Sequence, residues 1–288
     1  MTKLTFSGHE TFQCRSLWLK KGFDFLSDGR SFHAPEAVSH LGVGKNMVGA
    51  IRYWLNAFGV VKQDKLTKFG RFIFGSRGRD PYLEDLGTLW LLHYSLVTNN
   101  VASLYSLLFN EFRKERVDFT REQLKNFIRR KCEEEHTPFS LKTADRDIGV
   151  LLKNYVRPGG KSSNLEEDYT GIFLELDLIR EVPHFEGETA KRYRIENGDR
   201  DDIPPEILLF CILANSNYGR SVSFHELLNG DHSVGNVFAL TAEGLLRQID
   251  RIISKYAFVA YNEDAGIREI QFKKIPDKFE ILANYYAN

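Results

Sequence analysis

A stretch without formal charge sets the strongest limit on how this chain can fold. No aspartate, glutamate, lysine or arginine occurs from Leu86 to Asn110, so this stretch lies either in a membrane or in a protein core. Its centre, Thr98–Asn100, is polar, and His93 lies shortly before it, which is costly content for hydrocarbon. We therefore expect two buried helices joined at Thr98–Asn100 and no membrane span.

The remaining composition is typical of a globular protein. Hydrophobic residues make up 42% and charged residues 27% of the 288 residues, enough for one large domain or several small ones. The three cysteines, Cys14, Cys132 and Cys211, have no paired metal-ligand spacing and leave an odd thiol. Because the first residues also lack the apolar core of a signal peptide, we expect a cytoplasmic protein.

Residues 32–74 have the order of elements of a winged helix-turn-helix. Apolar residues at 3.6-residue spacing predict a helix over residues 45–58, and Gly59 can end it in a left-handed conformation. A strand is expected at residues 60–63, and Thr67 is a plausible N-cap for a following helix. Two short helices followed by a strand and a turn are typical of modules that read a DNA groove.

Later segments repeat this pattern. Thr120 begins a capping-box sequence ahead of an apolar helical stripe, and a second stripe runs over residues 141–155. Ser223 and Thr241 are N-cap candidates, and residues 257–272 are expected to form a hairpin. The predicted fold class is mainly α with small β-hairpins, arranged as tandem winged helix-turn-helix-like units.

A proline- and glycine-containing stretch, Arg157–Ser163, is the best candidate for a linker. After it, residues 178–196 are expected to form a hairpin around Gly187. We expect three domains: an N-terminal segment with a winged helix and a helical hairpin at residues 1–118, a second helix-turn-helix-like unit at residues 119–161, and a C-terminal winged-helix-like domain at residues 162–288.

The charge of the chain is unevenly distributed. Lysine and arginine balance aspartate and glutamate at 39 each, yet residues 1–79 carry 13 basic and 5 acidic residues. Residues 162–206 have the opposite bias, with 5 basic and 13 acidic residues. A polyanion such as double-stranded DNA would therefore bind the first part of the chain and be repelled by the middle.

The outward face of the helix at residues 45–58 is the candidate DNA-reading surface. Side chains near the N-terminal end of such a helix usually reach base edges, and small residues there allow close approach. We expect this face to carry Gly49, Ala50 and the DNA contacts Lys45, Asn46, Arg52, Tyr53 and Asn56. Further phosphate contacts are expected from Lys62, Lys65, Lys68, Arg71, Arg77 and Arg79. The alternative is that the winged helix serves as a protein-docking or dimerisation module.

The N-terminal segment is dense in functional groups but has no helical or strand period. Gly8 permits an unusual backbone angle that would aim His9 and Glu10 into one place, where they could bind a metal or move a proton. Arg15 could hold a phosphate. The alternative is a structural plug, with Phe6 and Phe12 seated in a groove.

A second candidate cluster contains Asp80, Glu84 and Asp85. Asp80 before Pro81 has the pattern of an N-cap and first helical residue, which explains these acids without function. The other interpretation is a site for Mg²⁺ or Mn²⁺, with Glu10, Asp80 and Asp85 as ligands for phosphodiester cleavage. The candidate catalytic residues are then His9, Glu10, Arg15, Asp80, Glu84 and Asp85. No nucleotide cofactor is expected, because the chain has no P-loop sequence.

These segments together resemble a known family, domain of unknown function 4007. The ordered series of motifs is specific, covers most of the chain and is strongest over residues 6–155. The resemblance rests on Phe6–Phe12 with Arg15, Trp18 and Lys21-Gly22, on Leu41–Met47, on Arg52–Trp54, on Asp80–Asp85 and on Leu89–His93.

The resemblance implies a part in a bacterial DNA phosphorothioation defence system of the Ssp type. A protein of this family is similar to a nicking component there, working beside a cysteine desulfurase, a sulfur transferase and an ATPase. A nick would expose the position at which sulfur replaces a non-bridging oxygen. The competing hypotheses are a non-enzymatic DNA-binding adaptor or transcriptional regulator, and a scaffold that contacts proteins alone; a homodimer is compatible with each.

Overall fold

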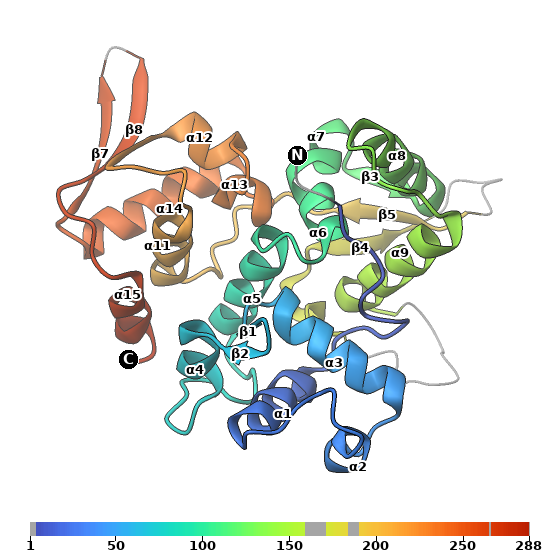
Figure 1. The fold of residues 1–288 in the computed structure, drawn as a ribbon. Helices are drawn as coiled ribbons and strands as arrows, with labels where there is room; N and C mark the ends of the chain where they lie inside the picture. Colours follow the sequence, from blue (N-terminus) through green and yellow to red (C-terminus); the bar gives the residue numbers. More distant parts are fainter. Residues whose placement is uncertain (1–3, 159–170, 184–189, 265, 288) are drawn as a thin grey trace. The chain divides into compact units, whose positions relative to one another are not determined.

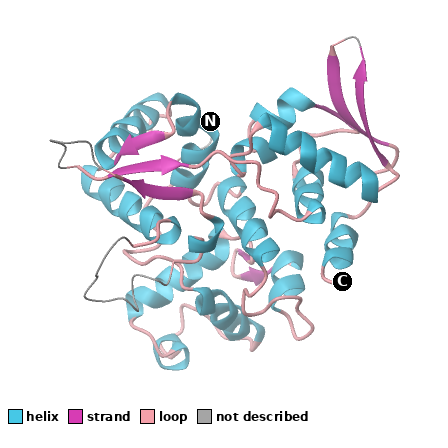
Figure 2. Cartoon of the chain, turned by 180° about the vertical axis from the view of Figure 1, so that it is seen from behind, coloured by secondary structure: helices cyan, strands magenta, loops and turns pink. Residues whose placement is uncertain are grey.

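The computed structural model describes residues 4–158, 171–183, 190–264 and 266–287 (Figure 1). The chain divides into two compact units, Met1–Glu196 and Asn197–Asn288, and each is described by itself. The structure is mainly helical with three small antiparallel sheets, drawn in magenta in Figure 2, which confirms the predicted class. The identity of any unit as a winged helix stays a prediction.

The first unit begins with the expected order of helices and hairpin. Helix α3 ends as predicted, because Gly59 adopts a φ of 67°. The turn between β1 and β2 is formed by Gln63 and Asp64, both with positive φ, and the Thr67 side chain caps α4. The elements are α1 (Ser16–Ser27), α2 (Ala37–Leu41), α3 (Lys45–Ala57), β1 (Val61–Lys62), β2 (Lys65–Leu66) and α4 (Lys68–Phe74).

The uncharged stretch forms two buried helical segments, as expected. Trp90 and His93 are fully buried, and His93 Nδ1 lies 2.7 Å from the Tyr155 hydroxyl. No helix in the described ranges is long and apolar enough to cross a bilayer. The stretch contains α5 (Leu86–Thr98), α6 (Ser103–Leu107) and the start of the π-helix η1 (Leu108–Phe112). The charged helix α7 (Arg113–Glu115) follows it.

The rest of the first unit is a small sheet with two helices. Thr120 forms the predicted capping box with Gln123. The strand order is β3-β5-β4, so the hairpin that we expected in a separate C-terminal domain pairs with the first unit through β3. The elements are β3 (Asp118–Thr120), α8 (Arg121–Glu134), α9 (Leu141–Tyr155), the short 3₁₀ helix η2 (Leu174–Leu176), β4 (Ile179–Val182) and β5 (Arg192–Ile195). Gly187, most of the Arg157–Ser163 linker and the expected boundary at 161/162 lie outside the described residues.

The second unit contains a strand, then helices, then two strands, which is the order of β3, α8, α9, β4 and β5 in the first unit. Ser223 forms a capping box with Glu226, and Thr241 caps α14, both as predicted. Its sheet has the order β6-β8-β7, the same arrangement as β3-β5-β4. The elements are α11 (Pro205–Ala214), β6 (Ser221–Ser223), α12 (Phe224–Asn229), α13 (Val234–Val237), α14 (Ala242–Lys255), β7 (Val259–Asp264), β8 (Ile267–Phe272) and α15 (Lys278–Tyr285).

Candidate nucleic-acid interface

Exposed basic side chains lie on the first two turns of α3, on the hairpin after it, on α4 and in the loop that follows α4. Lys45, Asn46 and Gly49 are exposed, and a Cβ at Gly49 would have no neighbour within 4 Å. The six candidate phosphate contacts are exposed as well: Lys62, Lys65, Lys68, Arg71, Arg77 and Arg79. We call Lys45, Asn46 and these six residues the basic surface.

Arg52 ties α3 to the hairpin instead of extending into solvent. Its Nε and Nη2 donate to the Asp64 carboxylate at 2.8 and 2.7 Å, a bidentate pair. This contact, first through the hydrogen bonds and then through charge, lowers the pKa of Asp64 from its ordinary 3.8. The same bonds raise the pKa of Arg52. Arg52 therefore orients the hairpin against α3.

Replacing Arg52 with alanine is expected to raise the pKa of Asp64 toward 3.8, observed in an NMR pH titration. A lowered carboxyl pKa stabilises the fold above about pH 4, and this contribution is lost as pH falls through the folded-state value. In the variant, the free energy of unfolding should no longer contain this pH-dependent contribution from Asp64. The pKa of Asp118, which Arg194 lowers in the same way, should not move. An unchanged Asp64 titration would contradict the assignment.

Two residues expected on the outward face of α3, Ala50 and Tyr53, pack against other parts of the protein. Ala50 is fully buried, and the Tyr53 ring packs against Gly8, where a Cβ would lie only 2.0 Å from Tyr53 Cδ2. Burial, and then the charge of Asp147, raises the pKa of Tyr53. Asn56 Nδ2 donates to the Arg52 carbonyl at 2.8 Å. The N-terminal segment thus occupies part of the face that we expected to be open.

The structure separates His9 from Glu10. His9 is 2% exposed, its ring stacks on Trp54 at 5.7 Å between centroids, and its Nε2 lies 3.2 Å from Asp147 Oδ1. Glu10 is exposed and has a φ of 57°. The two side chains are therefore not aimed into one place. Gly8 is needed for its close approach to Tyr53 and does not have a positive φ itself.

Hydrogen bonds hold residues 5–14 between α3, α6 and α9. Asp147 Oδ2 accepts from the Ser7 N–H at 2.9 Å, and Asn154 Oδ1 accepts from the Cys14 N–H at 3.0 Å. The Trp54 indole N–H donates to the Phe12 carbonyl at 3.1 Å. These contacts favour the alternative interpretation, in which the N-terminal segment is a structural plug.

Sequence reasoning did not single out Asp147. It lies on the buried face of α9 and is 4% exposed. An acid within the apolar stripe at residues 141–155 was the available signal, because a buried carboxylate needs a partner. Its partner, His9, is far away in the sequence.

The acidic segment mainly organises its own backbone. Asp80 is 6% exposed and accepts from the N–H groups of Glu84 and Asp85, at 2.9 and 3.1 Å. The helix α5 begins later than predicted, and Asp85, not Asp80, is its N-cap, accepting from Thr88 N–H at 3.0 Å. The reason is that Asp80 bonds to a loop in which Leu83 has a φ of 59°. Glu84 is exposed.

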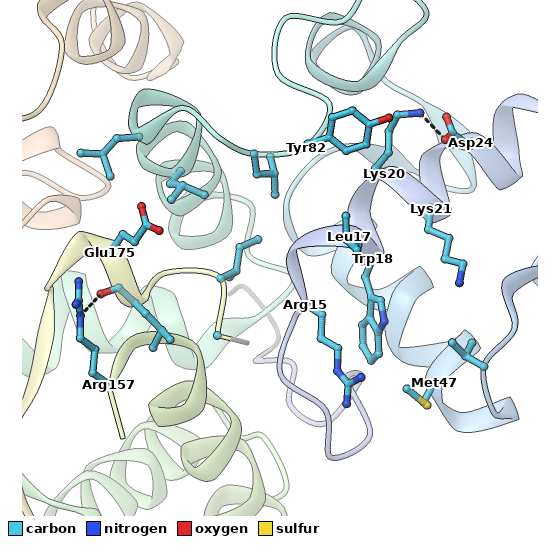
Figure 3. Close-up of a pocket in the computed structure, with 17 residues that line it drawn as sticks. Arg15, Leu17, Trp18, Lys20, Lys21, Asp24, Met47, Tyr82, Arg157 and Glu175 are labelled. Atoms are coloured by element: carbon cyan, nitrogen blue, oxygen red, sulfur yellow. Dashed lines mark hydrogen bonds and ion pairs between the residues drawn. The ribbon is translucent and has the colours of Figure 1, made fainter. Parts of the chain in front are cut away.

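A pocket of 1320 Å³ in the first unit brings three of these segments together. Figure 3 shows Arg15 and Lys21 on the wall that also carries Trp18 and Met47. Tyr82, from the acidic segment, contributes to the same pocket. The opposite wall includes Arg157 and Glu175. The Arg15 guanidinium lies 5.5 Å from the Trp18 ring centroid, a cation–π contact.

A family model described as a protein of unknown function, DUF4007, matches residues 6–286. The chain belongs to the DUF4007 family. The match spans nearly the whole chain, which confirms the resemblance inferred from the motifs. No curated protein sequence matches this DUF4007 protein.

Two solved structures, both of SspB, are similar to this DUF4007 protein. Each has a TM-score of 0.86 and 27% sequence identity, and the alignment covers 99% of this chain and 88% of SspB. The likeness therefore extends over both units of the chain. One of the two SspB structures contains a magnesium ion.

The predicted metal ligands do not form a common site in this DUF4007 protein. Across the described ranges, no group of three or more histidine, cysteine, aspartate or glutamate side chains is placed to hold a metal ion. Two of the predicted ligands, Asp80 and Asp85, accept backbone N–H groups, and Glu10 is exposed on a different segment. These three carboxylates are thus not gathered around one position.

Proposed function

We propose that this protein is the DNA-binding component of an Ssp-type DNA phosphorothioation defence system, and that it nicks one strand of the duplex. The observation that carries the proposal is the similarity to SspB over 99% of the chain. A nick would open the backbone for replacement of a non-bridging oxygen by sulfur. A cysteine desulfurase, a sulfur transferase and an ATPase would act beside it.

The basic surface supports DNA contact in the first unit. Lys45 and Asn46 are exposed in the first turn of α3, the part of a reading helix that reaches base edges. Exposed lysines on the hairpin and on α4 are suited to phosphate contact. Duplex binding through these residues would be electrostatic and would weaken as salt is raised.

The shared strand order supports winged helix-turn-helix units in the later part of the chain, with α9 and α14 in corresponding positions. Both helices contain three basic and two acidic residues. Arg247 of α14 pairs with Asp199 and Asp201, and Lys255 pairs with Glu206. Because acids of the same unit neutralise these cations, we assign duplex binding to the first unit.

The candidate catalytic groups differ in access to DNA. His9 and Asp80 are buried and have partners, so neither reaches a phosphodiester in this conformation. Glu10 and Glu84 are exposed, and Arg15 lies in the pocket wall. We propose that these three residues act on the phosphate, with Arg15 stabilising negative charge that develops in the transition state.

A plasmid assay tests nicking. The pure full-length protein is incubated with supercoiled plasmid and Mg²⁺ or Mn²⁺, and open-circular product is measured on a gel. We expect product with the parent protein, and at least about tenfold less with Glu10→Gln or Arg15→Ala, as for loss of one acid–base or electrostatic group. Asp145→Asn, at an exposed acid on α9, is the control. Equal product from all proteins would refute these catalytic assignments.

The second candidate function is a DNA-binding adaptor without enzymatic activity. The burial of His9 and the dispersed carboxylates favour it. It requires salt-sensitive duplex binding together with no open-circular product under either metal. The same plasmid assay, run beside a gel shift, therefore separates the two functions.

A further inference from the structure

The pocket bordered by α1 contains features that duplex binding does not explain. Its lining includes Leu17 and Tyr82, which are 61% and 58% exposed and are two of the six exposed large hydrophobic side chains among the described residues. Met47 and Leu89 add further apolar surface. An exposed apolar cluster that lines a pocket indicates a ligand.

The walls of this pocket are predominantly basic. Four basic side chains, Arg15, Lys20, Lys21 and Arg157, and two acidic ones, Asp24 and Glu175, line it. Lys20 pairs with Asp24 inside the pocket, as Figure 3 shows. In the described part of the chain Lys21 has no ion-pair partner, so its ammonium is open to an anionic ligand. The pocket thus combines positive charge with an exposed aromatic ring.

The place of the pocket points to the class of ligand. Val43 and Met47 line it, and between them in the sequence lie Lys45 and Asn46, the exposed end of the basic surface. A strand that separates from a duplex bound at α3 would therefore meet this pocket next. Its volume of 1320 Å³ exceeds the 300–1,000 Å³ typical of small-molecule sites.

We propose that this pocket binds single-stranded DNA. A base stacks on Tyr82, Leu17 and Met47 pack against apolar edges of the bases, and Lys21 contacts a phosphate. Positive charge that follows the backbone, together with aromatic rings for stacking, is how proteins hold single strands without reading sequence. The inference builds on the proposed duplex binding but concerns a different surface and a different form of DNA.

The test uses the full-length protein and a fluorescein-labelled oligo-dT of about ten nucleotides, a length within the usual site sizes. Fluorescence anisotropy measures its Kd. We expect Tyr82→Ala and Lys21→Glu each to weaken binding about tenfold, and Tyr82→Phe, which keeps the ring, to bind as the parent protein does. The matched controls are Ile275→Ala, at a site 55% exposed, and Lys274→Glu, both outside the pocket and expected to have no effect.

Tryptophan fluorescence gives a second readout. Trp54 and Trp90 are fully buried, whereas Trp18 lines the pocket and is 5% exposed. Oligo-dT should quench the fluorescence of the parent protein, and Trp18→Phe should remove the quenching while binding by anisotropy persists. Quenching that remains in the variant would place the oligonucleotide elsewhere.

Duplex binding, measured in parallel, separates this inference from the proposed function. If the protein binds oligo-dT through Tyr82 but does not bind a duplex, the pocket assignment stands and the proposed function fails. If duplex binding depends on Lys45 but Tyr82→Ala binds oligo-dT as Ile275→Ala does, the pocket assignment is wrong. Binding of an acidic, leucine-containing peptide in place of oligo-dT would also overturn it, and would identify a protein-docking pocket.

Discussion

Replacing Asp147 with alanine is expected to lower the free energy of unfolding of the first unit by about 3 kcal/mol. Asp147 is 4% exposed, lies 3.2 Å from His9 Nε2 and accepts the Ser7 N–H at 2.9 Å. Without the carboxylate, both groups lose their partner inside the protein. All three tryptophans, Trp18, Trp54 and Trp90, lie in this unit, so their fluorescence during urea unfolding measures its stability.

The neighbouring acid on α9 is the control for this prediction. Asp145 is 52% exposed and forms surface ion pairs with Arg121 and Lys125. Asp145→Ala should therefore change the free energy of unfolding by less than about 1 kcal/mol. Glu10→Ala, at an exposed position, should also have little effect on stability. Equal losses for Asp147→Ala and Asp145→Ala would contradict the proposed burial of the His9–Asp147 pair.

Reversing two charges of the basic surface is expected to weaken duplex binding about 100-fold at low salt, roughly tenfold for each lost phosphate contact. The variant is Lys45→Glu combined with Lys62→Glu. Both side chains are exposed and no described residue forms an ion pair with either, so the folded structure should be retained. Kd measured over a range of salt concentrations should give a log–log slope that is smaller by about 2.

A second double variant keeps the overall charge change the same. Lys273→Glu combined with Lys274→Glu alters two exposed lysines of the second unit, which we do not assign to duplex binding. It should bind duplex within about twofold of the parent protein if the contacts are local. If both double variants lose affinity equally, net charge alone governs binding, and the assignment of Lys45 and Lys62 as phosphate contacts is wrong.

Helix boundaries and caps were largely predictable from the sequence. Thr67, Thr120, Ser223 and Thr241 act as predicted, because a cap is formed between groups about three residues apart. The burial of α5 followed from its own lack of charge. Asp80 is the exception. Either Asp80 or Asp85 could have been the N-cap of α5, and the loop in which Leu83 has a positive φ leaves Asp85 at the start of the helix.

Only the tertiary structure decided how much of the polar face of α3 is open to solvent. The sequence alone determined that α3 is an amphipathic helix with a basic start, since this depends on the spacing of its own residues. It did not determine that Gly8 packs against Tyr53, or that His9 pairs with Asp147. Nor did it determine that β3 pairs with β5. Such contacts join residues far apart in the chain, and their free energies depend on burial and partners that only the folded molecule supplies.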